Sequence, residues 1–406
     1  MTNPSQPVGE GTARLPRYPM PRADGCPFDP PPALRGLRER APLAKVELWD
    51  GSTPWLVTRY ADQRAVLADP RVSADMAHPA YPLQGPGTGS LSLVGMDDPE
   101  HARLRRMVNA AFTVKKVEAL RPVVQRVVDD AVDALSAGPR PVDLVEAFAL
   151  PVPSLVICDL LGVPYADHGF FQARSRTLVH RGSTGEQRAA AIADLGRYLA
   201  GLLADRVDRP GDDLLSRLGE RVAAGELGAG QAAELAVLLL LAGHETTANM
   251  IALGTLLLLR HPDQLALLRD RDDPATTARA VEELLRYLTI THGGRRRFAL
   301  ADLEVGGQLV RAGEGLVLPT DVGNRDPAAF PDPDRLDLTR EARHHLAFGF
   351  GAHQCLGQSL ARLELEVAYR TLLRRVPGLR SAVDLDRIPF KHDGFVYGVH
   401  ELPVTW

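Results

Sequence analysis

The chain has 406 residues, with 47 basic and 51 acidic side chains and a formal net charge of −4. Hydrophobic residues make up 45% and charged residues 24%, as in a packed globular protein whose core is large enough to enclose a cofactor. The near-neutral charge gives no reason to expect nucleic-acid binding. Three cysteines, Cys26, Cys158 and Cys355, exclude a disulfide scaffold and favour a reducing, cytoplasmic location.

The first part of the chain is rich in proline and lacks the apolar core of a signal peptide. We therefore expect an extended N-terminal arm over residues 1–25. Short strands are expected around 45–48 and 55–58, on either side of a turn. From 62 to 286 the apolar spacing of three and four predicts helices. Residues 79–95 interrupt them with glycines and prolines, which predicts either a mobile, lid-like loop or a variable surface loop.

Residues 235–259 form an apolar stretch with a polar centre, which contains Glu245. A carboxylate in the middle of a membrane span is costly, so we interpret this stretch as a buried helix. Beyond 286, glycine turns separate three expected strands, and a final helix and a β-like tail follow. These segments cover 303–305, 308–310, 315–318, 356–375 and 396–404. No repeat or linker divides the chain, so residues 1–406 are expected to form a single, mainly α domain with a small β subdomain.

The segment Phe348-Gly349-Phe350-Gly351-Ala352-His353-Gln354-Cys355-Leu356-Gly357 places a cysteine where a helical pattern begins. A thiolate there gains from the helix dipole, which predicts a lowered pKa. One alternative is a buried structural cysteine. Another is a zinc site with His344, His345 and His353, although the usual zinc-ligand spacings are missing. A single cysteine in a glycine-rich loop fits one axial ligand of a flat cofactor better.

This segment resembles the haem-binding loop of the cytochrome P450 superfamily at every defined position. The resemblance implies a single-domain fold that encloses haem b between two long helices. It implies that Cys355 is the axial ligand of the haem iron and that His353 contacts a haem propionate. Phe348 and Gly349 would also contact the cofactor.

The segment Ala242-Gly243-His244-Glu245-Thr246-Thr247 lies in the polar centre of the apolar helix. A threonine here can donate a hydrogen bond to the carbonyl four residues earlier, that of Ala242, and bend the helix. An internally satisfied polar patch is the alternative. The segment resembles the oxygen-activation helix of the P450 superfamily. By that resemblance Thr246 would stabilise dioxygen and Glu245 would help to bring protons, while Ala242 and Gly243 would line the cleft above the haem.

Three further groups of polar residues match P450 elements. His101 and Arg105 lie four apart on one helix face, and the resemblance assigns both to haem propionates, with Arg297 as another propionate ligand. The run of arginines at 295–297 leaves the register of this last position open. Glu283 and Arg286 resemble the structural Glu-x-x-Arg element, with Arg335 as the third member in a stretch where Leu336 replaces the usual Phe. A solvated basic face and an exposed ion pair are the alternatives for these groups.

The substrate pocket is predicted, by family position, from largely apolar stretches that suit a bulky lipophilic molecule such as a polyketide, terpenoid or steroid. The residues named for it are Val94, Gly243, Ile290, Thr291, His292, Phe395 and Val396.

We therefore interpret the chain as a soluble, actinobacterial-type haem-thiolate monooxygenase that inserts one atom of O2 by hydroxylation or epoxidation. The sequence has no GxGxxG fingerprint for a flavin or nicotinamide, so electrons are expected from a separate ferredoxin and its reductase. We expect a monomer with no nucleic-acid or membrane partner. The alternatives are a peroxide-driven peroxygenase, against which Glu245 and Thr246 argue, and a non-catalytic haem sensor or recruiting protein. The basic surface expected to bind ferredoxin comprises Arg103, Arg106, Lys115, Lys116 and Arg362.

Overall fold

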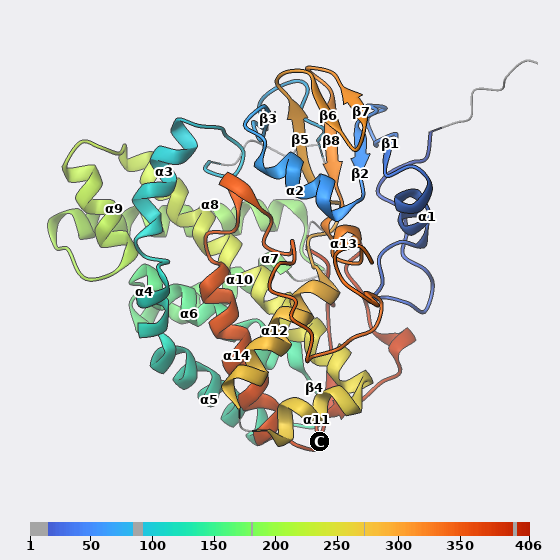
Figure 1. Ribbon diagram of the computed structural model, residues 1–406. Coiled ribbons are helices and arrows are strands. Elements are labelled where there is room, and N and C mark those ends of the chain that lie inside the picture. The colour runs from blue at the N-terminus through green and yellow to red at the C-terminus, as the bar shows by residue number, and fades with distance from the viewer. Residues whose placement is uncertain (1–14, 84–91, 180–181, 272, 393–395) are drawn as a thin grey trace, which may run out of the picture.

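The computed structural model describes residues 15–83, 92–179, 182–271, 273–392 and 396–406 (Figure 1). Most of the described chain is helical, and a smaller β-rich part lies at one edge of the helical body. The expected mainly α protein with a small β subdomain is confirmed.

The helices cover the chain from Pro32 to Arg375. They are α1 (Pro32–Arg40), α2 (Tyr60–Ala68), α3 (Glu100–Asn109), α4 (Val114–Ala119), α5 (Arg121–Ala137), α6 (Pro151–Leu161), α7 (His168–Val179), α8 (Gly185–Asp208), α9 (Leu214–Ala223), α10 (Ala229–Arg260), α11 (Pro262–Asp270), α12 (Pro274–Leu288), α13 (Thr320–Gly323) and α14 (Gln358–Arg375). A short π-helix, η1 (Val145–Ala149), and short 3-10 helices, η2 (Tyr165–Asp167), η3 (Gly351–His353) and η4 (Leu385–Arg387), accompany them.

Within the described residues, the strands form three small sheets of the orders β1-β2-β8-β5-β3, β4-β10-β9 and β6-β7. They are β1 (Leu43–Lys45), β2 (Trp55–Val57), β3 (Val72–Ser73), β4 (Val142–Asp143), β5 (Arg295–Ala299), β6 (Leu303–Val305), β7 (Gln308–Val310), β8 (Gly315–Leu318), β9 (Arg380–Ser381) and β10 (Pro403–Thr405). In the largest sheet β5 runs antiparallel to β8, with Arg297 opposite Leu316.

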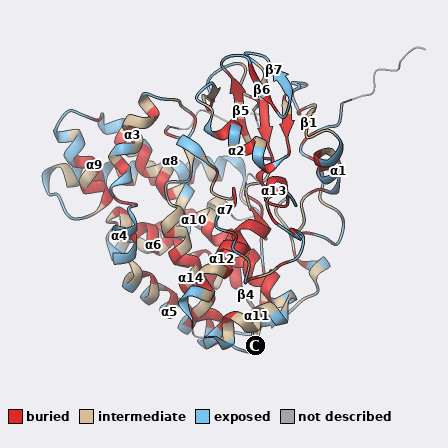
Figure 2. Ribbon diagram, viewed as in Figure 1, coloured by how far each residue is buried: buried red, intermediate tan, exposed pale blue. Residues whose placement is uncertain are grey.

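The long helix α10 lies at the centre of the helical body, where it packs against α6, α8 and α14. It is long and apolar enough to cross a membrane, but 61% of its most apolar window is buried inside the protein. Figure 2 shows buried residues in the helices around it and also in the strands of the β-rich part. The apolar surface of α10 therefore serves the core, as the polar centre of its sequence predicts.

The expected strands at 303–305, 308–310 and 315–318 are confirmed as β6, β7 and β8. Strand β5 was not predicted, because its three arginines hide the alternation that marks a strand. In the described part of the expected N-terminal arm, Tyr18 is buried and its backbone N–H donates to the Glu47 oxygen, so this part of the arm packs against the fold. Residues 84–91 of the expected loop lie outside the described part of the chain.

Candidate active site

The loop from Phe348 to Gly357 holds Cys355 just before the start of α14. Gly349 and Gly351 both have positive φ, +73° and +74°, a region that favours glycine. A side chain at Gly351 would collide with the backbone oxygen of Leu67 in α2, so only glycine fits there. The Cys355 N–H donates to the Phe348 oxygen at 2.8 Å and closes the loop.

The pKa of the Cys355 thiol is raised, because burial among protein atoms penalises the thiolate. The Gly357 N–H and three arginines, among them Arg295 and Arg105, act in the opposite direction without reversing the shift. The predicted lowering of this pKa is therefore wrong for the protein without a metal. Cys355 nevertheless keeps solvent-exposed surface, although many protein atoms surround it.

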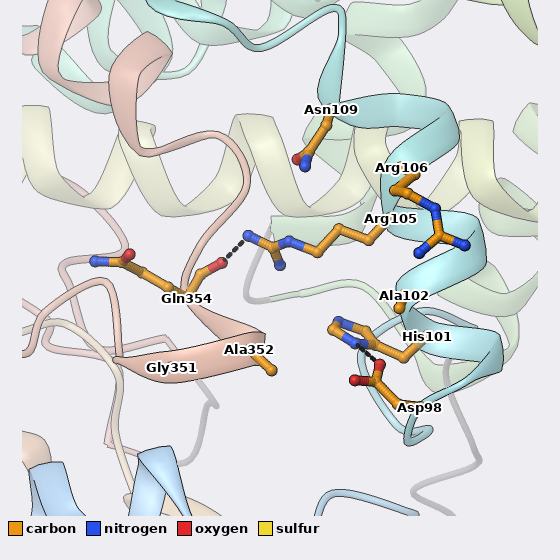
Figure 3. A pocket seen from close by; sticks show the side chains of 9 residues that line it. All are labelled: Asp98, His101, Ala102, Arg105, Arg106, Asn109, Gly351, Ala352 and Gln354. Atoms are coloured by element: carbon orange, nitrogen blue, oxygen red, sulfur yellow. Dashed lines mark hydrogen bonds and ion pairs between the residues drawn. The ribbon is translucent and has the colours of Figure 1, made fainter. Parts of the chain in front are cut away.

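A pocket of about 370 Å³ lies between α3 and the Cys355 loop. Figure 3 shows His101 and Arg105 reaching from α3 toward this loop. Arg105 Nη2 donates to the Gln354 oxygen at 2.6 Å, and the rings of His101 and His353 lie 4.1 Å apart between centroids. The structure thus brings together three of the residues that the sequence assigned to haem propionates.

The electrostatics of this cluster favour an anion. His101 Nδ1 lies 3.0 Å from Asp98 Oδ1, but its Nε2 atom is buried and has no partner among the described residues. The pKa of His353 is lowered to about 3 by burial and by the nearby charge of Arg297, so His353 is neutral at pH 7. Burial also lowers the pKa values of Arg105 and Arg297. Buried cations of this kind need an anionic partner.

The polar centre of α10 has the predicted local geometry. Thr246 Oγ1 donates to the Ala242 oxygen at 2.8 Å. One turn further on, Asn249 Nδ2 donates to the Glu245 oxygen at 2.8 Å. A methyl group at Gly243 would lie 3.2 Å from Ile157 Cδ1, so this glycine faces α6 and permits close helix packing. Because Gly243 faces α6, this contact does not support the expected role of Gly243 in lining the cleft above the haem.

His244 is a buried residue that sequence reasoning passed over. Both of its ring nitrogens are buried without a partner among the described residues. Burial, and next the charge of Lys391, lower its pKa to about 4. The pKa of Lys391 is itself lowered, because the effect of burial exceeds the opposing effect of the nearby Glu245. A polar residue within an apolar helix was the only sequence signal for this group.

The predicted substrate residues come from segments that the fold brings together. Thr291 pairs with Val396 in an antiparallel bridge, and the Tyr397 N–H donates to the Ile290 oxygen at 2.7 Å. The ring of His292 stacks on that of Tyr397 at 5.7 Å. Val94 lies outside this bridge with 48% of its surface exposed. Phe395 is not among the described residues.

The pair of Glu283 and Arg286 is fully buried, with two contacts of 2.7 and 2.8 Å. Its third member is Arg340, whose Nε lies 3.1 Å from Glu283 Oε1. The prediction of Arg335 is wrong: its side chain is 65% exposed and pairs with Asp332 and Asp337. The loop after α13 turns Arg335 outward, and Arg340, five residues later, reaches the core instead.

Comparison with known proteins identifies the family. Residues 209–378 match the family model described as Cytochrome P450. Cytochrome P450 GfsF of Streptomyces halstedii is 53% identical over 407 residues, covering 98% of each chain. The crystal structure of GfsF matches with a TM-score of 0.94 at 52% identity, over 96% of this chain and 100% of that one.

The names of two further relatives state an enzymatic activity. Pentalenic acid synthase of Streptomyces avermitilis is 50% identical over 412 residues and covers 100% of each chain. The mycinamicin VIII C21 methyl hydroxylase MycCI of Micromonospora griseorubida, crystallised with mycinamicin VIII, matches with a TM-score of 0.88 at 43% identity, over 97% of this chain and 100% of that one.

The fold, the cysteine loop and these similarities define a haem-thiolate class of oxidoreductase. The chain belongs to the cytochrome P450 family and is a cytochrome P450 monooxygenase. The predicted resemblance, fold class and enzyme class are confirmed. The residues present fit the family's haem: a cysteine stands in the loop, and the orphaned His101 Nε2 and the excess of cations suit the cofactor's two carboxylates.

Proposed function

We propose that this P450 uses haem b to insert one oxygen atom from O2 into a lipophilic natural product. The observation that carries the proposal is the convergence of Cys355 with the cluster of His101, Arg105 and His353. When bound, the haem supplies the redox chemistry that activates dioxygen and oxidises the substrate. The protein binds this cofactor, positions the substrate and delivers protons.

Cys355 provides the thiolate for the iron, and the glycines at 349 and 351 allow its loop to take the necessary path. His101, Arg105, Arg297 and His353 hold the two carboxylates. His101 Nε2 has no partner among the described residues, and Arg105 anchors the loop through Gln354. Phe348 packs under the guanidinium of Arg362, 4.6 Å from its ring centroid, and so forms part of the loop's support.

On α10, Thr246 carries the hydroxyl that can exchange its bond to Ala242 for one to a group in the site. Glu245 lies beside it and is within electrostatic range of Lys391. We infer that Glu245 relays protons from solvent and that Thr246 passes them on. This acid–alcohol pair supports a monooxygenase over a peroxygenase or a non-catalytic sensor.

The proposed substrate is a bulky natural product, because the bridge of residues 290–291 with 396–397 offers mainly apolar side chains and a histidine for one polar contact. The names of two relatives, a pentalenic acid synthase and a mycinamicin hydroxylase, support this class.

Electrons are proposed to come from a ferredoxin and its reductase at the face formed by α3 and α4. Three of the five expected docking residues are already engaged: Arg103 pairs with Glu100, Lys116 with Asp212 and Arg362 with Glu282. Arg106 and Lys115 are exposed, and Arg106 lines the pocket in Figure 3. We therefore assign the docking contact to these two residues of a monomeric, cytoplasmic enzyme.

The test is turnover under ¹⁸O2 with ferredoxin, reductase and NADPH against a panel of macrolides and terpenoids. One ¹⁸O atom per product, absent when ferredoxin is omitted, is expected. Product formation only with added peroxide would favour a peroxygenase. Ligand binding that shifts the haem spectrum, with no product and no consumption of NADPH, would contradict the proposal in favour of a sensor.

A further inference from the structure

Strand β5 carries three consecutive arginines, and successive side chains of a strand point to opposite faces. Arg296 occupies one face, where its Nη1 donates to the oxygens of Pro82 and Leu83 at 3.2 and 3.1 Å. Its Nη2 donates to Gly293 at 3.3 Å. Arg295 and Arg297 share the other face. Both terminal nitrogens of Arg296 thus donate to backbone carbonyls, although its Nε, like that of Arg295, is buried without a partner among the described residues. What sets its two neighbours apart is that they face the Cys355 loop.

Arg295 lies directly against that loop. Its Nη2 donates to the Ala347 oxygen at 3.1 Å, and a side chain at Gly349 would come within 3.0 Å of its Cζ. Its Nε atom is buried and has no partner among the described residues. Burial, and next the charge of Arg297, lower the pKa of Arg295 to about 10, which still leaves it protonated at pH 7.

The charges around Arg295 do not balance within the protein. Arg105, Arg295 and Arg297 are three cations that lie near the loop. The nearest acids are in use: Asp98 pairs with His101, and Asp97 accepts from the hydroxyl of Ser73 and the N–H of Ala74. Buried cations without a counter-charge are unfavourable. Two haem carboxylates and the thiolate would bring three negative charges.

We propose that Arg295 is a further haem-binding residue, whose Nε–H donates to a carboxylate of the cofactor beside Arg297 and whose charge stabilises the reduced iron. This inference rests on the proposed function. It adds a residue that the family motif does not include. It also answers which arginines of the run 295–297 contact the cofactor: those at 295 and 297 do, and the one at 296 does not.

The test compares the haem-loaded variants Arg295→Gln and Arg295→Lys with Arg296→Gln, a matched loss of a buried guanidinium on the other face of β5. Haem transfer to apomyoglobin and the midpoint potential are measured. A hydrogen bond to a charged group typically changes a binding constant by about a factor of ten or more. Arg295→Gln should therefore release haem on the order of ten times faster than the wild type. Its potential should fall by about 59 mV for each tenfold shift in the one-electron equilibrium. Arg295→Lys should keep most of the potential, and Arg296→Gln should change neither quantity.

Melting of the haem-free proteins provides the structural readout. If Arg295→Gln lowers that melting temperature as Arg296→Gln does, with unchanged haem release and potential, Arg295 only supports the loop and the proposal is overturned. If Arg295→Gln does not fold, Arg295→Lys decides, because lysine keeps the charge but lacks the guanidinium Nε–H. Haem release from Arg295→Lys no faster than from the wild type would then overturn the proposal as well. Failure of the proposed function is seen separately, as a wild-type protein without a thiolate-ligated spectrum.

Discussion

At the scale of single residues, the chemistry depends on hydroxyl, imidazole and guanidinium groups in unusual surroundings. Thr246 bends its hydroxyl back to Ala242, which keeps a donor at the polar centre of α10. Thr246→Ala should lower the rate of product formation on the order of a hundredfold, because general acid catalysis contributes about that much. The NADPH consumed should appear as peroxide instead. Thr246→Ser, which restores the hydroxyl, should recover most of the product, and equal coupling in Thr246→Ala and wild type would contradict the role.

His244 predicts how the stability of the fold depends on pH. Its pKa falls from an ordinary value to about 4 on folding, so the unfolded chain binds the proton more tightly. The stabilising contribution is present above about pH 6.5 and is lost as pH falls toward 4, by roughly 3 kcal/mol in all. His244→Leu should therefore flatten the free energy of unfolding between pH 6.5 and 4, measured by urea denaturation. An unchanged slope would mean that His244 is not neutral in the fold.

At the scale of elements, the buried carboxylate of Glu283 joins α12 to the segment that precedes the Cys355 loop. Removing one partner of a buried ion pair typically costs about 3–5 kcal/mol, while exposed pairs contribute at most about 1 kcal/mol. Arg340→Ala should therefore destabilise the protein by about 3 kcal/mol and Arg335→Ala by less than about 1 kcal/mol. Urea unfolding of the two variants decides between them. An equal loss of unfolding free energy in the two variants would mean that Arg335, too, belongs to the buried cluster of Glu283.

The predictable parts of the site are those that neighbouring residues determine. The Cys355 loop, the bond from Thr246 to Ala242 and the pairing of Glu283 with Arg286 depend on residues within ten positions of one another. Arg340 and the raised pKa of Cys355 depend on segments that meet only in the folded chain, so local pattern could not reveal them. The same holds for Arg295, since its role depends on the contact of β5 with a loop some fifty residues later.

At the scale of the whole molecule, the proposed docking contact for the electron donor consists of the exposed Arg106 and Lys115. Arg106→Glu should slow reduction by ferredoxin on the order of tenfold at low salt, and less at high salt, because charge complementarity acts mainly on the association rate. Arg126→Glu on α5 makes the same change in net charge on an exposed residue of another helix and should have little effect. If the two variants slow reduction equally, the docking face lies elsewhere.

The most direct test of the whole account is the absorption spectrum of the purified protein, reduced and exposed to carbon monoxide. We predict the strongly red-shifted Soret band of a thiolate-ligated ferrous–CO haem, and Cys355→Ala should abolish it while the Cys158→Ala protein keeps it. A band at the position of imidazole ligation, or a protein that binds no haem, would contradict the assignment of Cys355 as the axial ligand.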